Sequence, residues 1–305
     1  MPAPTDRPVS IPLSDEERDT GVLTPLHLFD AIDALFRDGL VVLNNAVELG
    51  VVDRLNERMK EDTERILSGE VKAYWNQGIE RGNVSQVPPL EEEYLFPQIY
   101  ANKPAGTILT RVLGPHPELR YIRSNTLIGN TSTRQRVHKD ATHIHLSHPY
   151  GVAFNTCLID VTPENGSTEV WLGTNNSSPP EDAETLGHPW IREEKLEERR
   201  KVRPPVQPVI PKGSVILRDL RLWHAGMPNH TPDTRVMLAL VYFASWYQNQ
   251  MNQPVPRSLK PTIETLQETN RTTFGVKYVE DGEADYLATE FVADFSSPLQ
   301  KVLGK

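Results

Sequence analysis

The sequence contains only one cysteine, Cys157, so the chain cannot form a disulfide bond within itself. It contains no apolar run that approaches the ~18 residues of a membrane-spanning helix. Its first residues, MPAPTDRPVSIPLSDEERD, lack the apolar stretch of a secretory signal. An excess of basic residues is also missing: the net charge is −9, which disfavours nucleic acids and anionic membranes as partners. We therefore expect a cytoplasmic protein whose thiol stays reduced.

What is present is the composition of a folded, enzyme-sized domain. The 305 residues are 38% hydrophobic and 24% charged, which supplies both a core and a hydrated surface. The 26 prolines indicate many turns and stiff loops. We expect a mobile polar tail over residues 1–20 and a single domain over residues 21–305.

The first part of that domain has the pattern helix–strand–helix. Thr24 is a suitable N-cap for a first helix, and Gly39 is a suitable end for it. The run LVVLNN (40–45) predicts a strand, and residues 51–67 predict a second amphipathic helix. Apolar residues recur at helical spacing along the first helix: Leu28, Phe29, Ile32, Leu35 and Phe36.

After residue 118 the sequence changes to short runs rich in β-branched and aromatic residues. They extend from YIRSNTLIG to RVMLALVYFASWY and are separated by turn signals such as Pro-Glu-Asn-Gly (163–166). This pattern predicts a mainly β sandwich or jelly roll with flanking helices, whose barrel core extends over about residues 119–247.

Two segments do not fit the strand pattern. Residues 177–206 lie between two predicted strands and contain EEKLEERRK, a short helix with compensating charges. Such an insertion at a barrel rim is either a lid over a binding site or a solvated surface helix. The C-terminal extension, residues 250–305, has scattered aromatic residues without a regular core pattern. We expect part of it to form a homodimer interface or a wall of the active site.

The stretch RQRVHKDATHIHLSH contains four histidines: His138, His143, His145 and His148. His138 and Asp140 are two residues apart, which places both side chains on one face of a strand, as a metal ion requires. Taken alone, this spacing is more often a surface ion pair. His148, which precedes Pro149, is expected in a turn or in a pocket wall. Ordinary packing or the surface is the alternative for all three of the other histidines, and a contact of one of them with substrate stays open.

A third candidate ligand, His224, lies at the end of a predicted strand in LRLWHAGMPN. Two histidines and one carboxylate on one face of a β-barrel form the facial triad of non-haem Fe(II) oxygenases. Three protein ligands leave positions open for a co-substrate and O₂. Zinc can use the same ligand types, although it usually takes four-coordinate sites.

Arg235 opens the predicted strand RVMLALVYF, which follows the strand that ends at His224. A guanidinium inside a barrel needs an anionic partner, because a buried unpaired charge is very costly. The far carboxylate of a dicarboxylic keto acid can supply that partner through a bidentate contact. A salt bridge at the barrel rim is the alternative.

Taken together, the H-x-D pair, NGSTEVWLGT, PKGSVILRDLRLWHAGMPN and the arginine that follows them resemble the phytanoyl-CoA dioxygenase family. The resemblance extends over roughly residues 25–245. It implies a double-stranded β-helix, which is a cupin-like jelly roll, and an oxygenase that depends on Fe(II), 2-oxoglutarate and O₂. One departure is Leu-Gly-Thr-Asn (172–175), where the family usually has a turn similar to Pro-Gly-Ser-His. This departure does not touch the metal-ligand positions.

The resemblance also implies roles for individual residues. His138, Asp140 and His224 would be the iron ligands and the catalytic centre, and Arg235 would bind the distal carboxylate of 2-oxoglutarate. Three further residues match positions that bind the co-substrate: Thr168, Gln135 and Asn125.

The reaction implied by the resemblance is oxidation of an unactivated C–H bond in a small organic molecule, with release of succinate and CO₂. Hydroxylation, desaturation, epoxidation and rearrangement are open outcomes. Asp140 argues against halogenation, because related halogenases replace this carboxylate with a small residue. The sequence has no compact basic cluster for the phosphates of coenzyme A, so an acyl-CoA is not favoured. The resemblance implies a secondary metabolite as substrate, and we expect a small apolar or polycyclic natural product. Two other classes stay open: a metal-bound cupin-like enzyme that does not use 2-oxoglutarate, and a non-catalytic binding barrel.

Overall fold

The computed structural model describes residues 6–140, 148–176, 182–184, 189–283, 285–288 and 293–298. Its strands are β1 (Val9–Pro12), β2 (Leu40–Asn44), β3 (Asn83–Gln86), β4 (Glu118–Leu127), β5 (Gly151–Cys157), β6 (Glu169–Val170), β7 (Val215–Asp219), β8 (His224–Ala225), β9 (Arg235–Phe243), β10 (Gln253–Pro256), β11 (Thr273–Phe274) and β12 (Val276–Val279). Its α-helices are α1 (Asp15–Thr20), α2 (Pro25–Asp38), α3 (Leu49–Leu67), α4 (Pro97–Tyr100), α5 (Lys103–Val112), α6 (Glu193–Val202) and α7 (Lys260–Asn270).

One mixed sheet forms the centre of the protein, with the strand order β1-β2-β7-β5-β9-β4-β11 and with β3 beside β4. The pairs from β2 to β4 along this order are antiparallel, and a small second sheet pairs β6 with β8. Alternation along β9 separates two environments. Val236 and Leu238 point into the main hydrophobic core, whereas Met237 and Ala239 line a cavity on the other face. The predicted mainly β jelly roll with flanking helices is confirmed.

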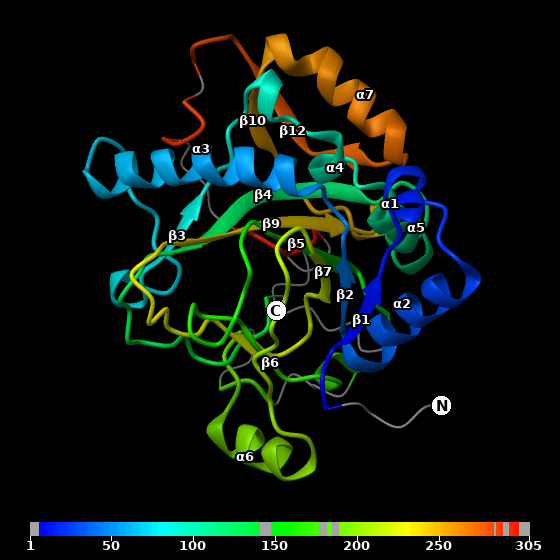
Figure 1. Ribbon diagram of the computed structural model, residues 1–305, viewed down its shortest axis with the longest axis vertical. Helices are drawn as coiled ribbons and strands as arrows, with labels where there is room; N and C mark the ends of the chain where they lie inside the picture. The colour runs from blue at the N-terminus through cyan, green and yellow to red at the C-terminus, as the bar shows by residue number, and fades with distance from the viewer. Residues whose placement is uncertain are drawn as a thin grey trace.

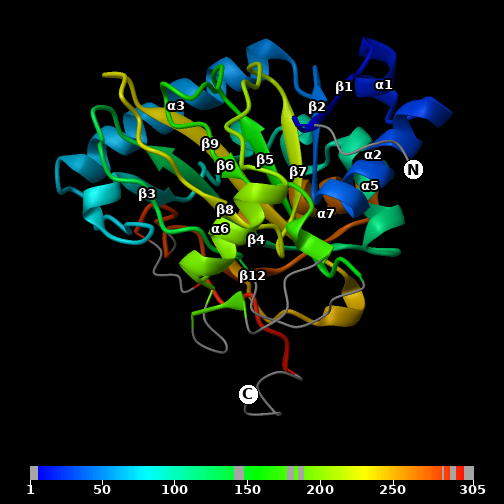
Figure 2. The same cartoon turned by 90° about the horizontal axis from the view of Figure 1, so that it is seen from below.

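The helices and the small sheet lie on different sides of the main sheet. In Figure 1, α3, α4 and α7 lie on one side of strands β4 and β9, and α6 with β6 lies on the other. Figure 2 shows α6 and the β6–β8 sheet from below, in front of the main sheet. The cavity is therefore enclosed between the main sheet and the β6–β8 sheet. None of the helices in the described ranges is long and apolar enough to cross a membrane.

The helix–strand–helix predicted at the start of the domain is confirmed. The Thr24 side chain caps α2 by accepting a hydrogen bond from a backbone N–H at 3.2 Å, and Gly39 ends the helix with φ of 76°. The buried face of α2 contains small residues, Ala31 and Ala34, which let the helix approach its neighbours closely. Phe29 fits the helical spacing but is 65% exposed, so the apolar face is narrower than the sequence pattern.

The prediction of a mobile tail over residues 1–20 is wrong for the part that the structure describes. Strand β1 pairs in parallel with β2, and Ile11 and Leu13 are 3% and 4% exposed. Ser14 then caps α1 in a capping box with Glu17. The sequence pattern does not reveal β1 because this strand has only four residues, too few to show alternation.

The C-terminal extension also folds onto the domain. Strand β11 joins the edge of the main sheet in parallel with β4, and β10 pairs with β12. Residues 293–298 are held by Asn249, whose Nδ2 donates to the carbonyls of Asp294 and Ser296 at 2.8 and 2.9 Å. This part of the extension is thus held by its own chain, and Phe295 lines the cavity.

Candidate active site

Two histidines that are far apart in the sequence face each other across an antiparallel bridge. His138 and His224 exchange backbone hydrogen bonds of 2.9 Å in both directions, and their ring centroids are 4.3 Å apart. Directly opposite residues of this kind place their side chains on one face. The backbone N–H of Asp140 donates to Leu220 O at 3.0 Å, which fixes the carboxylate nearby. The three side chains therefore offer possible metal-ligand atoms within 4.8 Å of one another.

The segment that carries His138 is extended but is not one of the regular strands. His138 forms bridges both to His224 and to Trp190, which belongs to the insertion. The Lys139 N–H donates to Pro189 O at 3.0 Å. Part of the insertion thus supports the backbone of the predicted metal ligand.

Hydrogen bonds to backbone carbonyls set the orientation of both imidazole rings. Nδ1 of His138 lies 2.8 Å from Arg136 O, and Nδ1 of His224 lies 3.0 Å from Leu222 O. Because a carbonyl only accepts, these contacts place the proton on Nδ1 and the lone pair on Nε2 of each ring, and Gln77 Nε2 approaches Nε2 of His138 to 3.5 Å. The two Nε2 atoms lie 3.8 and 3.5 Å from Asp140 Oδ1. These are the tautomers that metal binding through Nε2 requires.

Burial and charge favour the protonation states of a metal site. Desolvation by burial lowers the pKa of His138 and takes the pKa of His224 well below its ordinary value, so both rings are neutral near pH 7. Burial alone would raise the pKa of Asp140, but the charge of Arg218 and its hydrogen bond to the carboxylate hold this pKa well below its usual range. Two neutral imidazoles and a carboxylate suit Fe(II).

Arg218, on β7, is a residue of this site that the motif analysis did not identify. Its Nη2 donates to Asp140 Oδ2 at 2.6 Å. Its Nη1 also lies 3.2 Å from Nδ1 of His224, which is a contact and not a hydrogen bond when Nδ1 carries the proton. One carboxylate oxygen is therefore held by Arg218 while the other faces the histidines. The signal in the sequence is strand alternation along VILRD, because residues 216 and 218 must share one face of a strand. In the structure Ile216 and Arg218 line the cavity, whereas Leu217 between them is in the core.

Arg235 lies at the start of β9, is only 2% exposed and lines the same cavity. Its Nε and Nη2 donate to the carbonyls of Asn165 and Gly166 at 3.2 and 3.3 Å. Its Nη1 has no hydrogen-bond partner within the described part of the chain. Desolvation by burial lowers the pKa of Arg235 to about 10. The guanidinium thus has one buried donor that could bind an anion, and the described residues do not supply that anion. The alternative, a salt bridge of Arg235 at the barrel rim, is not formed with any described residue.

The three further co-substrate candidates, Thr168, Gln135 and Asn125, line this cavity as well. Gln135 Oε1 accepts from the Gly226 N–H at 2.9 Å, and Asn125 Oδ1 accepts from Asn76 Nδ2 at 3.2 Å. The structure therefore brings every predicted site residue to one cavity, and their individual binding roles stay predictions.

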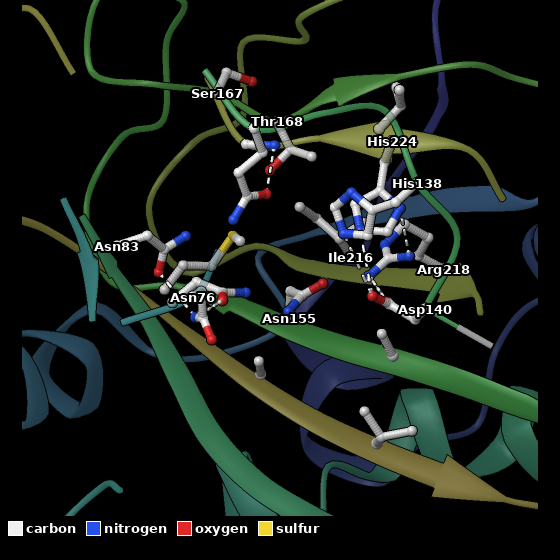
Figure 3. A pocket seen from close by; sticks show the side chains of 18 of the residues that line it. Asn76, Asn83, His138, Asp140, Asn155, Ser167, Thr168, Ile216, Arg218 and His224 are labelled. Carbon is white, nitrogen blue, oxygen red and sulfur yellow. Dashed lines mark hydrogen bonds and ion pairs between the residues drawn. The ribbon is translucent and has the colours of Figure 1, made fainter. Parts of the chain in front are cut away.

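The cavity has a volume of about 230 Å³. Figure 3 shows His138, His224, Asp140 and Arg218 on one side of it, with Asn76 and Asn83 on the opposite side. Residues of the main sheet and of the C-terminal extension complete the wall, among them Ala153, Met237, Val241, Ala293 and Phe295.

Two of the other histidines in the cluster, His143 and His145, lie outside the described residues. His148 is half-buried, and its ring centroid lies 5.8 Å from that of Phe36. His148 is not one of the residues that line the cavity. The prediction of a pocket-wall residue is therefore wrong for this cavity, and the packing alternative agrees with the position of His148.

A jelly roll that holds two histidines and a carboxylate beside a buried arginine defines the class of non-haem iron oxygenases that use 2-oxoglutarate. The chain belongs to the phytanoyl-CoA dioxygenase (PhyH) family, whose model matches residues 35–237. The resemblance inferred from the sequence motifs is thereby confirmed.

Solved structures show the same fold at low sequence identity. EctD from S. alaskensis with bound Fe is 20% identical with a TM-score of 0.57, and the match covers 78% of this chain and 82% of that one. The non-heme alpha ketoglutarate dependent carbocyclase SnoK from nogalamycin biosynthesis is 16% identical with a TM-score of 0.55, over 73% and 85%. AviO1 from Streptomyces viridochromogenes Tue57 is 21% identical with a TM-score of 0.52, over 72% and 96%.

Proposed function

We propose that this protein is an Fe(II)- and 2-oxoglutarate-dependent oxygenase that oxidises an unactivated C–H bond of a small organic molecule and releases succinate and CO₂. The observation that carries the proposal is the unpartnered Nη1 of Arg235 in the cavity of the triad. A metal-bound cupin-like enzyme without 2-oxoglutarate would account for the triad but not for this buried donor. A non-catalytic binding barrel would not need the complete donor set.

One set of cavity residues would bind the metal, and another would bind the co-substrate. His138 and His224 would hold iron through Nε2, and Asp140 would hold it through Oδ1. Bound Fe(II), with O₂ and 2-oxoglutarate, supplies the oxidising power for C–H cleavage. Arg218 keeps the second oxygen of Asp140 engaged, and Arg235 would bind the distal carboxylate of 2-oxoglutarate.

Thr168 and Gln135 line the same cavity as Arg235 and are proposed to bind the co-substrate. Asn125, the third candidate, also lines this cavity but is instead proposed to contact the substrate. The substrate is proposed to be a secondary metabolite. SnoK, which has the same fold, comes from nogalamycin biosynthesis, and this supports the proposal without identifying the molecule. The direct test adds O₂ to anaerobically loaded protein in a host metabolite extract. A product that has gained one oxygen atom or lost two hydrogen atoms supports the proposal, and succinate release without any such product counts against it.

We propose that residues 177–206 cover the cavity as a lid, of which the structure describes residues 182–184 and 189–206. The described part is held at two points: Trp190 bridges His138, and Leu196 of α6 is buried in the cluster that contains Trp223. Deletion of residues 179–202 should raise succinate formation in the absence of substrate, because water would reach the metal more freely.

Trp190→Ala is the matched variant for this deletion, because it removes the side chain but keeps the backbone bridge to His138. Both variants need an iron determination, since the deletion also removes that bridge. Succinate formation at the wild-type rate in both variants would contradict the lid and mean that the insertion is only a surface element.

We also propose a cytoplasmic homodimer built from single-domain subunits, each with a barrel core over about residues 119–247. The predicted role of the extension in a wall of the active site is supported within one chain by Ala293 and Phe295. Light scattering at micromolar concentration is expected to give the mass of two chains. The mass of one chain would contradict the dimer and leave the oxygenase proposal unchanged.

A further inference from the structure

Three asparagines form an interlocked cluster on the side of the cavity that faces the triad. Asn76 Nδ2 donates to Asn83 Oδ1 at 3.1 Å and to Asn125 Oδ1 at 3.2 Å. Asn76 and Asn83 are held opposite each other, because the Asn76 N–H donates to Asn83 O at 2.8 Å. Asn125 belongs to β4, which pairs with β3. The cluster is thus fixed by backbone pairing on both sides.

The hydrogen bonds within the cluster involve the side-chain carbonyl oxygens of Asn83 and Asn125 but not their amide nitrogens. Asn76 Nδ2 occupies the carbonyl oxygens of both Asn83 and Asn125. The amide nitrogens of Asn83 and Asn125 have no hydrogen-bond partner among the residues that the structure describes. Both residues line the cavity, and Asn83 is only 6% exposed. Neither nitrogen is among the fully buried atoms that lack a partner, so both stay accessible from the cavity, where the acceptor of a ligand can reach them.

The charged groups that line the cavity already have other partners. Beyond the triad, the charged lining residues in the described part of the chain are Arg218 and Arg235. Arg218 is paired with Asp140, and Arg235 is the proposed site for the co-substrate. Arg123 is buried on β4 near Asn125 but is not one of the lining residues. The described wall thus offers amides, hydroxyls and apolar side chains to a substrate, and no further charge.

We infer that the asparagine cluster is the substrate-binding subsite and that it takes an uncharged molecule through a carbonyl-type oxygen acceptor. A ketone, lactam or ester oxygen would accept from Asn83 Nδ2 and Asn125 Nδ2, and the apolar body would lie against Met237 and Val241 toward the triad. A carboxylate or an acyl-CoA does not match this wall, because no free cation lines it in the described residues. The inference rests on the proposed function only for the statement that the bound molecule is oxidised.

The test compares four probes with one bicyclic skeleton: tetralone, tetralin, tetralin carboxylate and aminotetralin. Binding is measured by ligand-observed NMR titration on protein that carries Zn(II) and N-oxalylglycine, an unreactive analogue of 2-oxoglutarate. Tetralone should bind most tightly. Asn83→Leu should weaken tetralone binding by about two- to tenfold, the usual effect of one hydrogen bond, and should leave tetralin binding unchanged or tighter.

Asn83→Asp is the sharper variant because it keeps the shape of the side chain. One carboxylate oxygen can still accept from Asn76, while the other replaces the donor that faces the cavity. Tetralone binding should fall at least tenfold and aminotetralin binding should rise. Asn252→Leu is the matched control, because Asn252 is exposed and is not one of the cavity-lining residues. This variant should bind every probe as the wild type does. Thermal unfolding checks that each variant folds.

Three outcomes would overturn the inference: tighter binding of tetralin carboxylate than of tetralone, absence of tetralone binding, or tetralone binding that neither Asn83 variant changes. Asn125→Leu separates substrate from co-substrate. If it weakens N-oxalylglycine binding but leaves tetralone binding unchanged, Asn125 belongs to the co-substrate and the subsite as stated is wrong. Failure of N-oxalylglycine to bind the wild-type protein would count against the proposed function, and the comparison of tetralone between variants would still stand.

Discussion

Replacement of His224 by alanine should abolish iron binding and turnover while the protein stays folded. The ring contributes one of the donors that converge within 4.8 Å, and its Nε2 lone pair is free because Nδ1 is bonded to Leu222 O. Loss of an outer partner of a metal ligand typically costs roughly 10- to 100-fold in affinity or activity. Loss of a ligand itself should cost more. His138→Ala and Asp140→Ala should have the same effect, because neither remaining pair of ligands forms a facial triad.

Iron content per chain and succinate formation are the two measurements for this prediction. His148→Ala is the matched control, since His148 belongs to the same histidine-rich stretch but contacts Phe36 rather than the cavity. This control should keep its iron. His143→Ala tests whether a histidine outside the proposed ligand set binds the iron. Equal loss of iron and activity in His143→Ala would mean that the ligand set has been chosen wrongly.

Arg235→Gln should weaken 2-oxoglutarate binding by roughly 30- to several-thousand-fold while the iron content stays near that of the wild type. The size follows from the loss of one partner of a buried charge pair, which costs about 2–5 kcal/mol, at about 1.4 kcal/mol for each factor of ten. Arg235 is buried and its Nη1 has no partner among the described residues, so the proposal has its anionic partner arrive with the co-substrate. The metal-free variant should lose little stability, because the substitution also removes an unpaired buried charge.

Anaerobic titration of the charge-transfer absorption of Fe(II) and 2-oxoglutarate measures this effect. Arg134→Gln is the matched control: Arg134 is 41% exposed and paired with Glu169, so its loss should cost at most ~1 kcal/mol. Binding of the primary substrate should change much less than binding of the co-substrate. A wild-type midpoint in Arg235→Gln would remove the proposed role of this arginine and weaken the 2-oxoglutarate assignment.

The residues of the site that sequence reasoning identified are those fixed by strand ends. His138, His224 and Arg235 each lie at or beside a point where an extended segment meets a turn, and this placement can be inferred from local pattern and spacing. Arg218 was harder because three charged residues, Arg218, Asp219 and Arg221, follow one another before His224. Asp219 and Arg221 pair with each other at 2.5 Å, and only the register of β7 shows which charge faces the metal ligands.

The asparagine cluster could not be predicted for a different reason. Asn76 and Asn83 lie in a region whose sequence has neither helical nor alternating periodicity, and their meeting depends on the pairing of residues 74–76 with β3. Asn125 reaches them only through the register between β3 and β4. Such contacts arise from long-range pairing, which a local pattern does not contain. The short strand β1 was missed because four residues show too little alternation.

The wall formed by Ala293 and Phe295 has a consequence for how this protein can diversify. The family match ends at residue 237, so both residues lie outside the part of the chain that defines the family. Substitutions, insertions or exchanges in residues 293–298 can therefore reshape the wall without touching the metal ligands or Arg235. Duplicated copies of such a gene can keep one reaction centre and acquire new substrates through their C-terminal ends. For protein engineering, this segment is the first place to exchange between relatives.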